Sequence, residues 1–268
     1  MPEKVTLPLF PPATIVPPSP RHPYYTINGE EMVRVTKVLG DTQPKPYLVP
    51  WAKGVALEAV RFELLRVGPL FAPSPEAWPQ YVENILRAAA KRPDEKRDEA
   101  AEYGTRMHKL LQAYLKDGGI EGAIDYGLVV AFDEARKWLD TRPGRVVAVE
   151  QTVWNRLTPE TGDVVLSYAG TVDVIWENED GTLDVGDWKS AKAIWPEAAE
   201  QLGAYAGAVE QLTSRTVRDC WVMRVPKEQP EPGVPLFEAA RLADWRASYE
   251  DFLLSRLRWE RAKRKVYG

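Results

Sequence analysis

The chain has 268 residues, of which 44% are hydrophobic and 28% are charged. This balance is typical of a globular protein, and the length allows one large domain or one domain with an addition. A formal net charge of −4 excludes a histone-like protein that binds nucleic acid through bulk positive charge. The single cysteine, Cys220, excludes an internal disulfide. The apolar runs are too short to span a membrane. We therefore expect a cytoplasmic protein without a membrane segment.

Proline is concentrated near the N-terminus, where eleven of the 23 prolines fall within the first 50 residues. Residues 1–23 are therefore expected to form an extended, proline-rich arm. The rest of the chain, residues 24–268, is expected to form a single domain. Its first part, residues 24–93, would add strands and helices to a core. These elements are a strand and turn at 24–29, a short strand or helix start at 33–38, and a helix at 48–66.

The second part, residues 94–225, has the pattern of that core. A helix is expected after Pro93, because apolar residues recur at helical spacing from Met107 to Leu115 and two glycines follow. The further elements expected, in order, are a helix at 124–140, strands at 146–154, 164–176 and 183–189, a helix at 196–212, a strand at 217–225 and a last helix at 239–265. This order predicts an α/β fold with a mixed central β-sheet flanked by helices.

The most informative polar residues are Asp173, Asp187 and Lys189. Residues i and i+2 of a strand share a face, so Asp187 and Lys189 should point the same way, and Asp173 on the neighbouring strand can converge on them. Two converging carboxylates form a site for a hard cation such as Mg²⁺ or Mn²⁺. A lysine beside such a site can orient a water or neutralise charge on a phosphoryl oxygen. The short Asp-x-Lys pattern is also common on solvated strands, so it gains weight only from its surroundings.

Two of the expected helices carry further polar groups. His108 lies beside the apolar stripe of its helix, so its imidazole can point towards the sheet. Gln201 and Tyr205 are four residues apart, which places the amide and the phenol on one helix face. Taken singly, each of these features is ordinary for a helix.

Together, these residues form an ordered set of motifs: Gly-Thr-x-x-His at 104–108, Gly-Thr-x-Asp at 170–173, Asp-x-Lys at 187–189 and Gln-x-x-x-Tyr at 201–205. The set resembles the RecB-type branch of the PD-(D/E)XK nucleases over about residues 94–225. More weakly, residues 35–39 and 45–52 are similar to the N-terminal segment of phage and mitochondrial exonucleases of this branch. The resemblance implies a restriction-endonuclease-like core of order αβββαβ.

The resemblance also implies a metal site. His108, Asp173 and Asp187 would ligate one or two Mg²⁺ or Mn²⁺ ions, and the backbone carbonyl of Trp188 would be a further ligand. Glu150, on the first expected strand, is either an additional acid near the metal or a carboxylate at the strand edge. The iron–sulfur members of this branch need four cysteines, so that cluster is excluded here.

The remaining residues of the set have implied roles around the metal. Lys189 would be the catalytic lysine, acting with Asp187 and Asp173. Gln201 and Tyr205 would position the DNA backbone, or hold Lys189 and the metal ligands in place. The side chains expected to contact DNA phosphates beside them are Arg106, Lys109 and Lys192.

The function implied is a metal-dependent exonuclease that hydrolyses phosphodiester bonds from DNA ends, in phage or bacterial recombination, repair or replication. Single-stranded DNA, or DNA with single-stranded ends, would be the substrate, in the cytoplasm of a bacterial host cell. The chain has no helicase P-loop, so the nuclease would be free-standing. Three alternatives stay open: a structure-specific or restriction-like endonuclease, a catalytically inactive nucleic-acid-binding module, and an α/β protein in which the motifs are coincidental.

Overall fold

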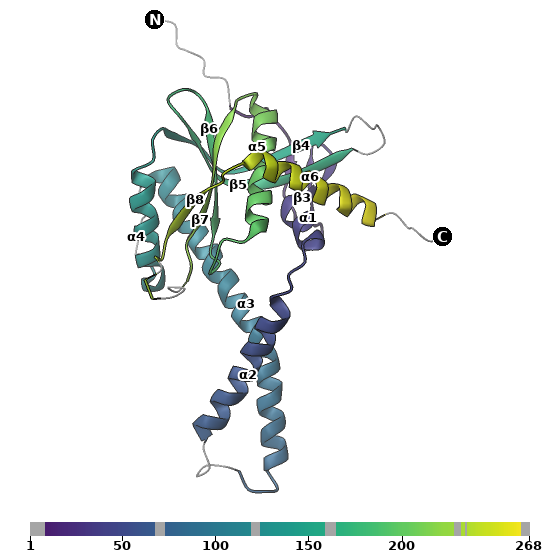
Figure 1. The fold of residues 1–268 in the computed structure, drawn as a ribbon, viewed down its shortest axis with the longest axis vertical. Coiled ribbons are helices and arrows are strands. Elements are labelled where there is room, and N and C mark those ends of the chain that lie inside the picture. The colour runs from purple at the N-terminus through teal and green to yellow at the C-terminus, as the bar shows by residue number, and fades with distance from the viewer. Residues whose placement is uncertain are drawn as a thin grey trace, which may run out of the picture. The chain divides into compact units, whose positions relative to one another are not determined.

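The computed structural model describes residues 9–67, 73–118, 124–158, 165–227, 232–233 and 235–263. The chain divides into two compact units. Unit 1 comprises Met1–Gln43 and Arg106–Gly268, and unit 2 comprises Pro44–Thr105 (Figure 1). Unit 2 consists of helix α2 (Leu48–Val67) and the first part of α3 (Trp78–Asp117), which continues into unit 1.

Unit 1 contains a mixed β-sheet with helices on its faces. Its strands are β1 (Ile15–Val16), β2 (Tyr24–Ile27), β3 (Glu30–Arg34), β4 (Arg145–Leu157), β5 (Leu166–Glu177), β6 (Leu183–Lys189), β7 (Val217–Arg224) and β8 (Glu238–Arg241). Its helices, besides the end of α3, are α1 (Val35–Thr42), α4 (Tyr126–Asp140), α5 (Pro196–Thr213) and α6 (Trp245–Ala262). The predicted α/β class with a mixed, helix-flanked sheet is confirmed.

Strand β5 organises the sheet because three strands pair with it. One edge pairs antiparallel with β4 from Leu166 to Glu177. The other edge is shared: β3 pairs parallel with Tyr168 and Ala169, and β6 pairs antiparallel with residues 174–177. Within the described chain, no strand pairs with residues 170–173 on this shared edge. The sheet continues outward from β3 to β2 and β1, and from β6 to β7 and β8.

Alternating side chains of the strands face two layers of helices. On one face, Val222 of β7 belongs to the main core with residues of α1, α5 and α6, and α5 lies across the sheet in Figure 1. On the other face, Trp221 of β7 and Trp176 of β5 contact the ring of Trp138 from α4. The main core is packed to backbone contact between α5 and α6: a Cβ at Gly203 would lie 2.5 Å from the backbone nitrogen of Tyr249.

Several expected element boundaries follow from local signals. The turn between β5 and β6 has Gly181 at a φ of +84°, as its Asp-Gly pair predicts. Helix α3 ends before Gly118, which has a φ of +68° and donates its N–H to the carbonyl of Tyr114. Pro196 begins α5, where its missing N–H is not needed.

The expected start of the long helix after Pro93 is wrong. Helix α3 begins at Trp78 and continues through Pro93. A proline removes its own N–H bond and crowds the carbonyl four residues earlier, but it need not end a helix that other contacts support. Here Arg92 forms ion pairs with Glu95 and Glu99 across the proline.

The expected start of the last helix at residue 239 is also wrong. Residues Glu238–Arg241 form β8, which pairs with the edge of β7. Helix α6 begins at Trp245, after Asp244, whose carboxylate accepts hydrogen bonds from the backbone N–H groups of Arg246 and Ala247. Residues 264 and 265 of the expected helix lie outside the described residues.

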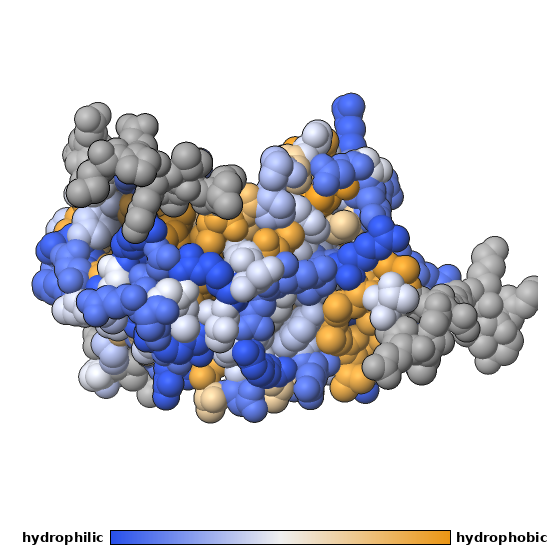
Figure 2. Space-filling view, turned by 90° about the horizontal axis from the view of Figure 1, so that it is seen from above, coloured by the Kyte–Doolittle hydropathy of each residue, from blue (hydrophilic) through white to orange (hydrophobic). Residues whose placement is uncertain are grey.

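The expected N-terminal arm is described from residue 9. Part of it, β1, pairs with β2, and Leu9 and Phe10 pack against the main core. In the part of the chain that is described, no helix combines the length and apolar character needed to cross a bilayer. The face in Figure 2 shows hydrophilic and hydrophobic residues side by side.

Candidate active site

The candidate site lies where β5 and β6 diverge. The pair Val174–Gly186 is the end of their ladder, and Asp173 and Asp187 occupy the next positions. Both residues are buried: 7% of the surface of Asp173 is exposed and 3% of that of Asp187. The backbone N–H of Trp188 donates to Asp173 Oδ2 over 2.6 Å, which holds the two strands together beyond their last pair. The Gly-Thr-x-Asp motif thus fills the stretch of β5 that lacks a partner on its shared edge.

Three side chains from different elements form a possible metal-binding group. One ligand atom each of His108 (α3), Glu150 (β4) and Asp173 (β5) lies within 4.8 Å of the others. His108 Nδ1 is 3.5 Å from Asp173 Oδ1. Two carboxylates and an imidazole are a donor set that suits divalent cations with a preference for oxygen and nitrogen. The residues present therefore fit a divalent metal ion.

Glu150 has a backbone conformation that is unusual within a strand. Its φ is +53°, and the strand register places it opposite Asp173, between the pairs Val149–Val174 and Gln151–Val172. A non-glycine residue in the left-handed region costs about 1–2 kcal/mol. Such local strain is concentrated at functional sites, where the surrounding structure enforces it. Here it accompanies a carboxylate that belongs to the possible metal-binding group.

Lys189 belongs to a second network beside this group. Its ammonium lies 2.5 Å from Asp187 Oδ2 and donates to Gln201 Oε1 over 2.9 Å. The Gln201 amide donates in turn to Asp187 Oδ1 and to the Tyr205 hydroxyl, each over 3.0 Å. The Tyr205 ring packs on Gly170 so closely that a Cβ there would lie 2.4 Å from Cε1 of the ring. A side chain at position 170 would displace the Tyr205 ring, so the glycine of the Gly-Thr-x-Asp motif is needed for the network to form.

Burial and like charge disfavour the ionised carboxylates of the site. Burial raises the pKa of Asp187 to about 6, Lys189 opposes this rise, and Asp173 adds to it. Burial and the charge of Asp173 also raise the pKa of Glu150. Burial alone would lower the pKa of His108, but its hydrogen bond and charge attraction to Asp173 leave the pKa raised. A site with this excess of negative charge favours a cation.

The structure brings together seven residues that the sequence analysis singled out: His108, Glu150, Asp173, Asp187, Lys189, Gln201 and Tyr205. The carboxylate of Asp187 contacts Lys189 and Gln201 and is not part of the His-Glu-Asp group, and its role as a metal ligand stays a prediction. Trp188 contributes its N–H to Asp173, and the ligand role of its carbonyl stays a prediction.

The three expected DNA-contacting cations have different surroundings. Arg106 forms an ion pair with Asp125, the residue that caps α4. Lys109 and Lys192 are exposed. One contact near the site was not anticipated: the Tyr25 hydroxyl of β2 lies 2.8 Å from the hydroxyl of Thr171. Thr171 shares a strand face with Asp173, which was a usable signal, whereas nothing local connects it to a residue 146 positions away.

Comparison with models of known protein families gave no match, and no curated protein matched the chain. The α/β fold and the residues of the site are therefore the basis for a functional interpretation. Cys220 is buried and is the chain's one cysteine, so the metal-binding candidates are oxygen and nitrogen donors.

Proposed function

We propose that the chain is a Mg²⁺- or Mn²⁺-dependent deoxyribonuclease of the RecB-type PD-(D/E)XK branch, with a restriction-endonuclease-like core. It would act as an exonuclease on DNA ends in phage or bacterial recombination, repair or replication. One observation carries the proposal: the Asp187–Lys189–Gln201 network, formed by β6 and α5, lies next to a His-Glu-Asp donor set, where two paired strands diverge. Either group alone would be a weak signal.

The donor set has a clear role in phosphodiester hydrolysis. His108, Glu150 and Asp173 would hold the metal ion, and Asp187 lies next to them as a further acid. A metal ion held there would lower the pKa of a bound water and neutralise charge on the phosphoryl oxygens. The Trp188 N–H fixes the orientation of Asp173 by occupying one of its oxygens, which leaves Oδ1 towards His108.

Lys189 is placed to act on the reacting groups. Its side chain is 27% exposed, whereas the carboxylate that it pairs with is buried, so its ammonium can reach a substrate. A positioned ammonium can donate a hydrogen bond to the attacking water or to the oxygen that gains negative charge. Gln201 accepts from Lys189 and donates to Asp187, so it keeps the ammonium at the site, and Tyr205 holds Gln201.

The experiment that tests this function compares linear single-stranded DNA, labelled at either end, with circular single-stranded DNA. The wild type and Lys189→Ala are incubated with each substrate in Mg²⁺, Mn²⁺ or EDTA. We expect metal-dependent loss of the linear DNA only, and none with the variant. Lys137→Ala, which alters an exposed lysine of α4 paired with Asp133, is the matched control and should cleave like the wild type.

The other results have distinct meanings. Cleavage of the circle would replace the exonuclease by an endonuclease. DNA binding without cleavage of these substrates or their duplex forms would indicate a nucleic-acid-binding module. Normal turnover by Lys189→Ala would remove the proposed role of the lysine. The intact set of Asp173, Asp187 and Lys189 favours an active enzyme.

A further inference from the structure

One arginine near the site has no partner for its charge. Arg34 is the last residue of β3, and it is half-buried. Its Nε is buried without a hydrogen-bond partner, and the guanidinium forms no ion pair with any residue that the structure describes. A buried donor without an acceptor lowers the stability of the fold. Such a group therefore points to an acceptor that comes from outside the chain.

The strand register places Arg34 on the same face of the sheet as the possible metal-binding group. Arg34 pairs with Ala169 of β5, and residues paired across two strands point to the same face. Thr171 and Asp173 follow on that face, two and four residues along β5. The preceding residue of β3, Val33, belongs to the main core on the other face. Arg34 thus begins a row that ends at the metal-binding group.

Tyr25 of β2 connects the two ends of this row. Its hydroxyl lies 2.8 Å from the hydroxyl of Thr171. Burial raises the pKa of Tyr25, the positive charge of Arg34 opposes this rise, and the negative charge of Glu150 adds to it. The hydroxyl is therefore within reach of both the guanidinium and an acid of the metal-binding group.

The spacing along β5 separates Arg34 from the metal-binding group. Ala169 and Asp173 are four residues apart, which is about 13 Å along a strand. Arg34 starts beside Ala169, and its charge acts on the hydroxyl that contacts Thr171, midway between them. A group held by Arg34 would thus be a neighbour of a group held by the metal, and not the same group.

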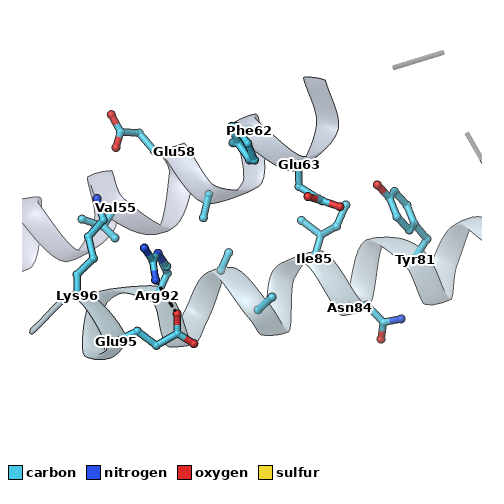
Figure 3. A pocket seen from close by; sticks show the side chains of 13 residues that line it. Val55, Glu58, Phe62, Glu63, Tyr81, Asn84, Ile85, Arg92, Glu95 and Lys96 are labelled. Carbon is cyan, nitrogen blue, oxygen red and sulfur yellow. Dashed lines mark hydrogen bonds and ion pairs between the residues drawn. The ribbon is translucent and has the colours of Figure 1, made fainter. Parts of the chain in front are cut away.

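The arginine in the groove of unit 2 is different. This groove, of about 780 Å³, lies between α2 and α3. Figure 3 shows Arg92 there with Glu95, and its guanidinium pairs with both Glu95 and Glu99. Its charge is therefore already neutralised within the chain, whereas that of Arg34 is not.

We propose that Arg34 binds a phosphate group of the DNA strand, next to the phosphate that lies at the metal-binding group. The strand would then run along the stretch of β5 that lacks a partner, towards β3. A guanidinium presents two N–H groups that match two phosphate oxygens, and its weak hydration suits a half-buried position. This inference rests on the proposed function, because it takes the ligand to be the nucleic acid of a nuclease.

The first test measures binding of a short fluorescent single-stranded oligonucleotide by anisotropy, in Ca²⁺ and in EDTA. Arg34→Gln should raise the dissociation constant by about tenfold. It should also reduce the salt dependence of log Kd on log salt by about 0.7, the value for one lost contact with a single strand. Arg156→Gln, at an exposed arginine of β4 paired with Glu30, is the matched control and should bind like the wild type. Unchanged affinity and salt dependence in Arg34→Gln, or an equal loss in the control, overturns the proposal.

The second test separates a binding role from a structural one by thermal unfolding without DNA. Arg34→Met removes the unpartnered donor and keeps the apolar part of the side chain. The variant should melt at or above the wild-type temperature, while its dissociation constant for the oligonucleotide rises by about tenfold. A melting temperature well below that of the wild type overturns the proposal, because Arg34 would then have a partner within the folded chain.

The inference and the proposed function can fail separately. A wild type that binds the oligonucleotide but never cleaves DNA removes the nuclease and leaves the contact of Arg34. Cleavage by the wild type, with normal binding by Arg34→Gln, removes only the role of Arg34. A wild type that binds no DNA overturns both.

Discussion

The two units of the molecule bury very different amounts of apolar surface. The main core of unit 1 gathers 23 buried residues from its sheet and helices. In the described part of unit 2, four hydrophobic residues are buried: Val55, Ile85, Ala89 and Tyr103. A short pair of helices with so small a core gains little stability of its own. Unit 1 can therefore hold side chains in fixed positions for chemistry, whereas the helices of unit 2 are held together by few buried side chains.

The largest expected difference is in DNA cleavage, between a variant at a lysine of unit 1 and a variant at a lysine of unit 2. Lys189→Ala should lower the rate of DNA cleavage by about 10²–10³-fold, because it removes the ammonium that contacts Asp187. Lys96→Ala, in the groove of unit 2, should leave the rate within about twofold. Single-turnover cleavage of a labelled oligonucleotide measures both.

Metal binding distinguishes the role of Asp173 from that of Lys189. Asp173→Ala should remove metal binding and cleavage together, because Asp173 belongs to the donor set, whereas Lys189→Ala should keep most of the metal affinity. Calorimetric titration with Mn²⁺ compares them. In the cleavage assay, a Lys96→Ala rate as low as that of Lys189→Ala would assign the catalytic site to unit 2.

The next effect in size is stabilisation of unit 1 by a divalent cation. At 100 times the dissociation constant, a ligand that binds only the folded chain adds about 2.7 kcal/mol to the free energy of unfolding. Metal ligands must be deprotonated, so binding weakens as protons compete. We expect Mn²⁺ to raise the melting temperature fully at neutral pH and progressively less as the pH falls, because the raised pKa values of His108 and Glu150 let protons compete with the metal.

The metal-free protein should show the opposite trend. Folding raises the pKa of Asp187 from its usual 3.8 to about 6, so the folded chain binds more protons in this range and its stability falls as the pH rises through it. Asp187→Asn should remove this decline, and thermal unfolding at several pH values in EDTA would detect it. The same decline in the variant would contradict the assignment to Asp187.

Two glycines in helices should then respond with opposite signs. Gly203→Ala in α5 puts a Cβ 2.5 Å from the backbone of Tyr249, and backbone cannot move aside without separating α5 from α6. Overpacking of this kind costs about 3 kcal/mol, against about 1 kcal/mol gained in helix propensity. Chemical denaturation should show a net loss of about 2 kcal/mol. Unchanged stability would mean that α5 and α6 pack less closely than the structure shows.

The smallest effect is expected at Gly54 in α2. A Cβ there meets no atom of the described residues within 4 Å, so Gly54→Ala should stabilise the helix by about 0.5–1 kcal/mol. Hydrogen exchange of the α2 amides should slow about twofold to fivefold. Faster exchange in the variant would show that the glycine is needed for a contact in unit 2.

Much of the site could be predicted from the sequence because its signals are local. Asp187 and Lys189 are two residues apart on one strand, and Gln201 and Tyr205 are four apart on one helix, so periodicity alone aligns each pair. The Asp-Gly turn between β5 and β6 then brings Asp173 beside Asp187. His108 needed more, because only the resemblance connected its helix to the carboxylates.

The parts that could not be predicted depend on distant partners. The pairing of Arg34 with Ala169 and the contact of Tyr25 with Thr171 join residues far apart in the chain. The strand β8 forms because the edge of β7 is available, not because Glu238–Arg241 has a strong strand pattern. Likewise, the left-handed backbone of Glu150 is imposed by its surroundings, since glutamate itself disfavours it.

The sharing of one edge of β5 between β3 and β6 has a consequence for protein synthesis. Strands β4 and β6 are close to β5 in sequence. Strand β3 is far from it, so it can pair only after Tyr168 and Ala169 have left the ribosome. At 5–20 residues per second, that delay is on the order of ten seconds. During this time the apolar residues of β2 and β3 have no sheet to join. We expect the N-terminal strands to dock last, and a stalled chain that ends before β5 to be bound by chaperones at this segment.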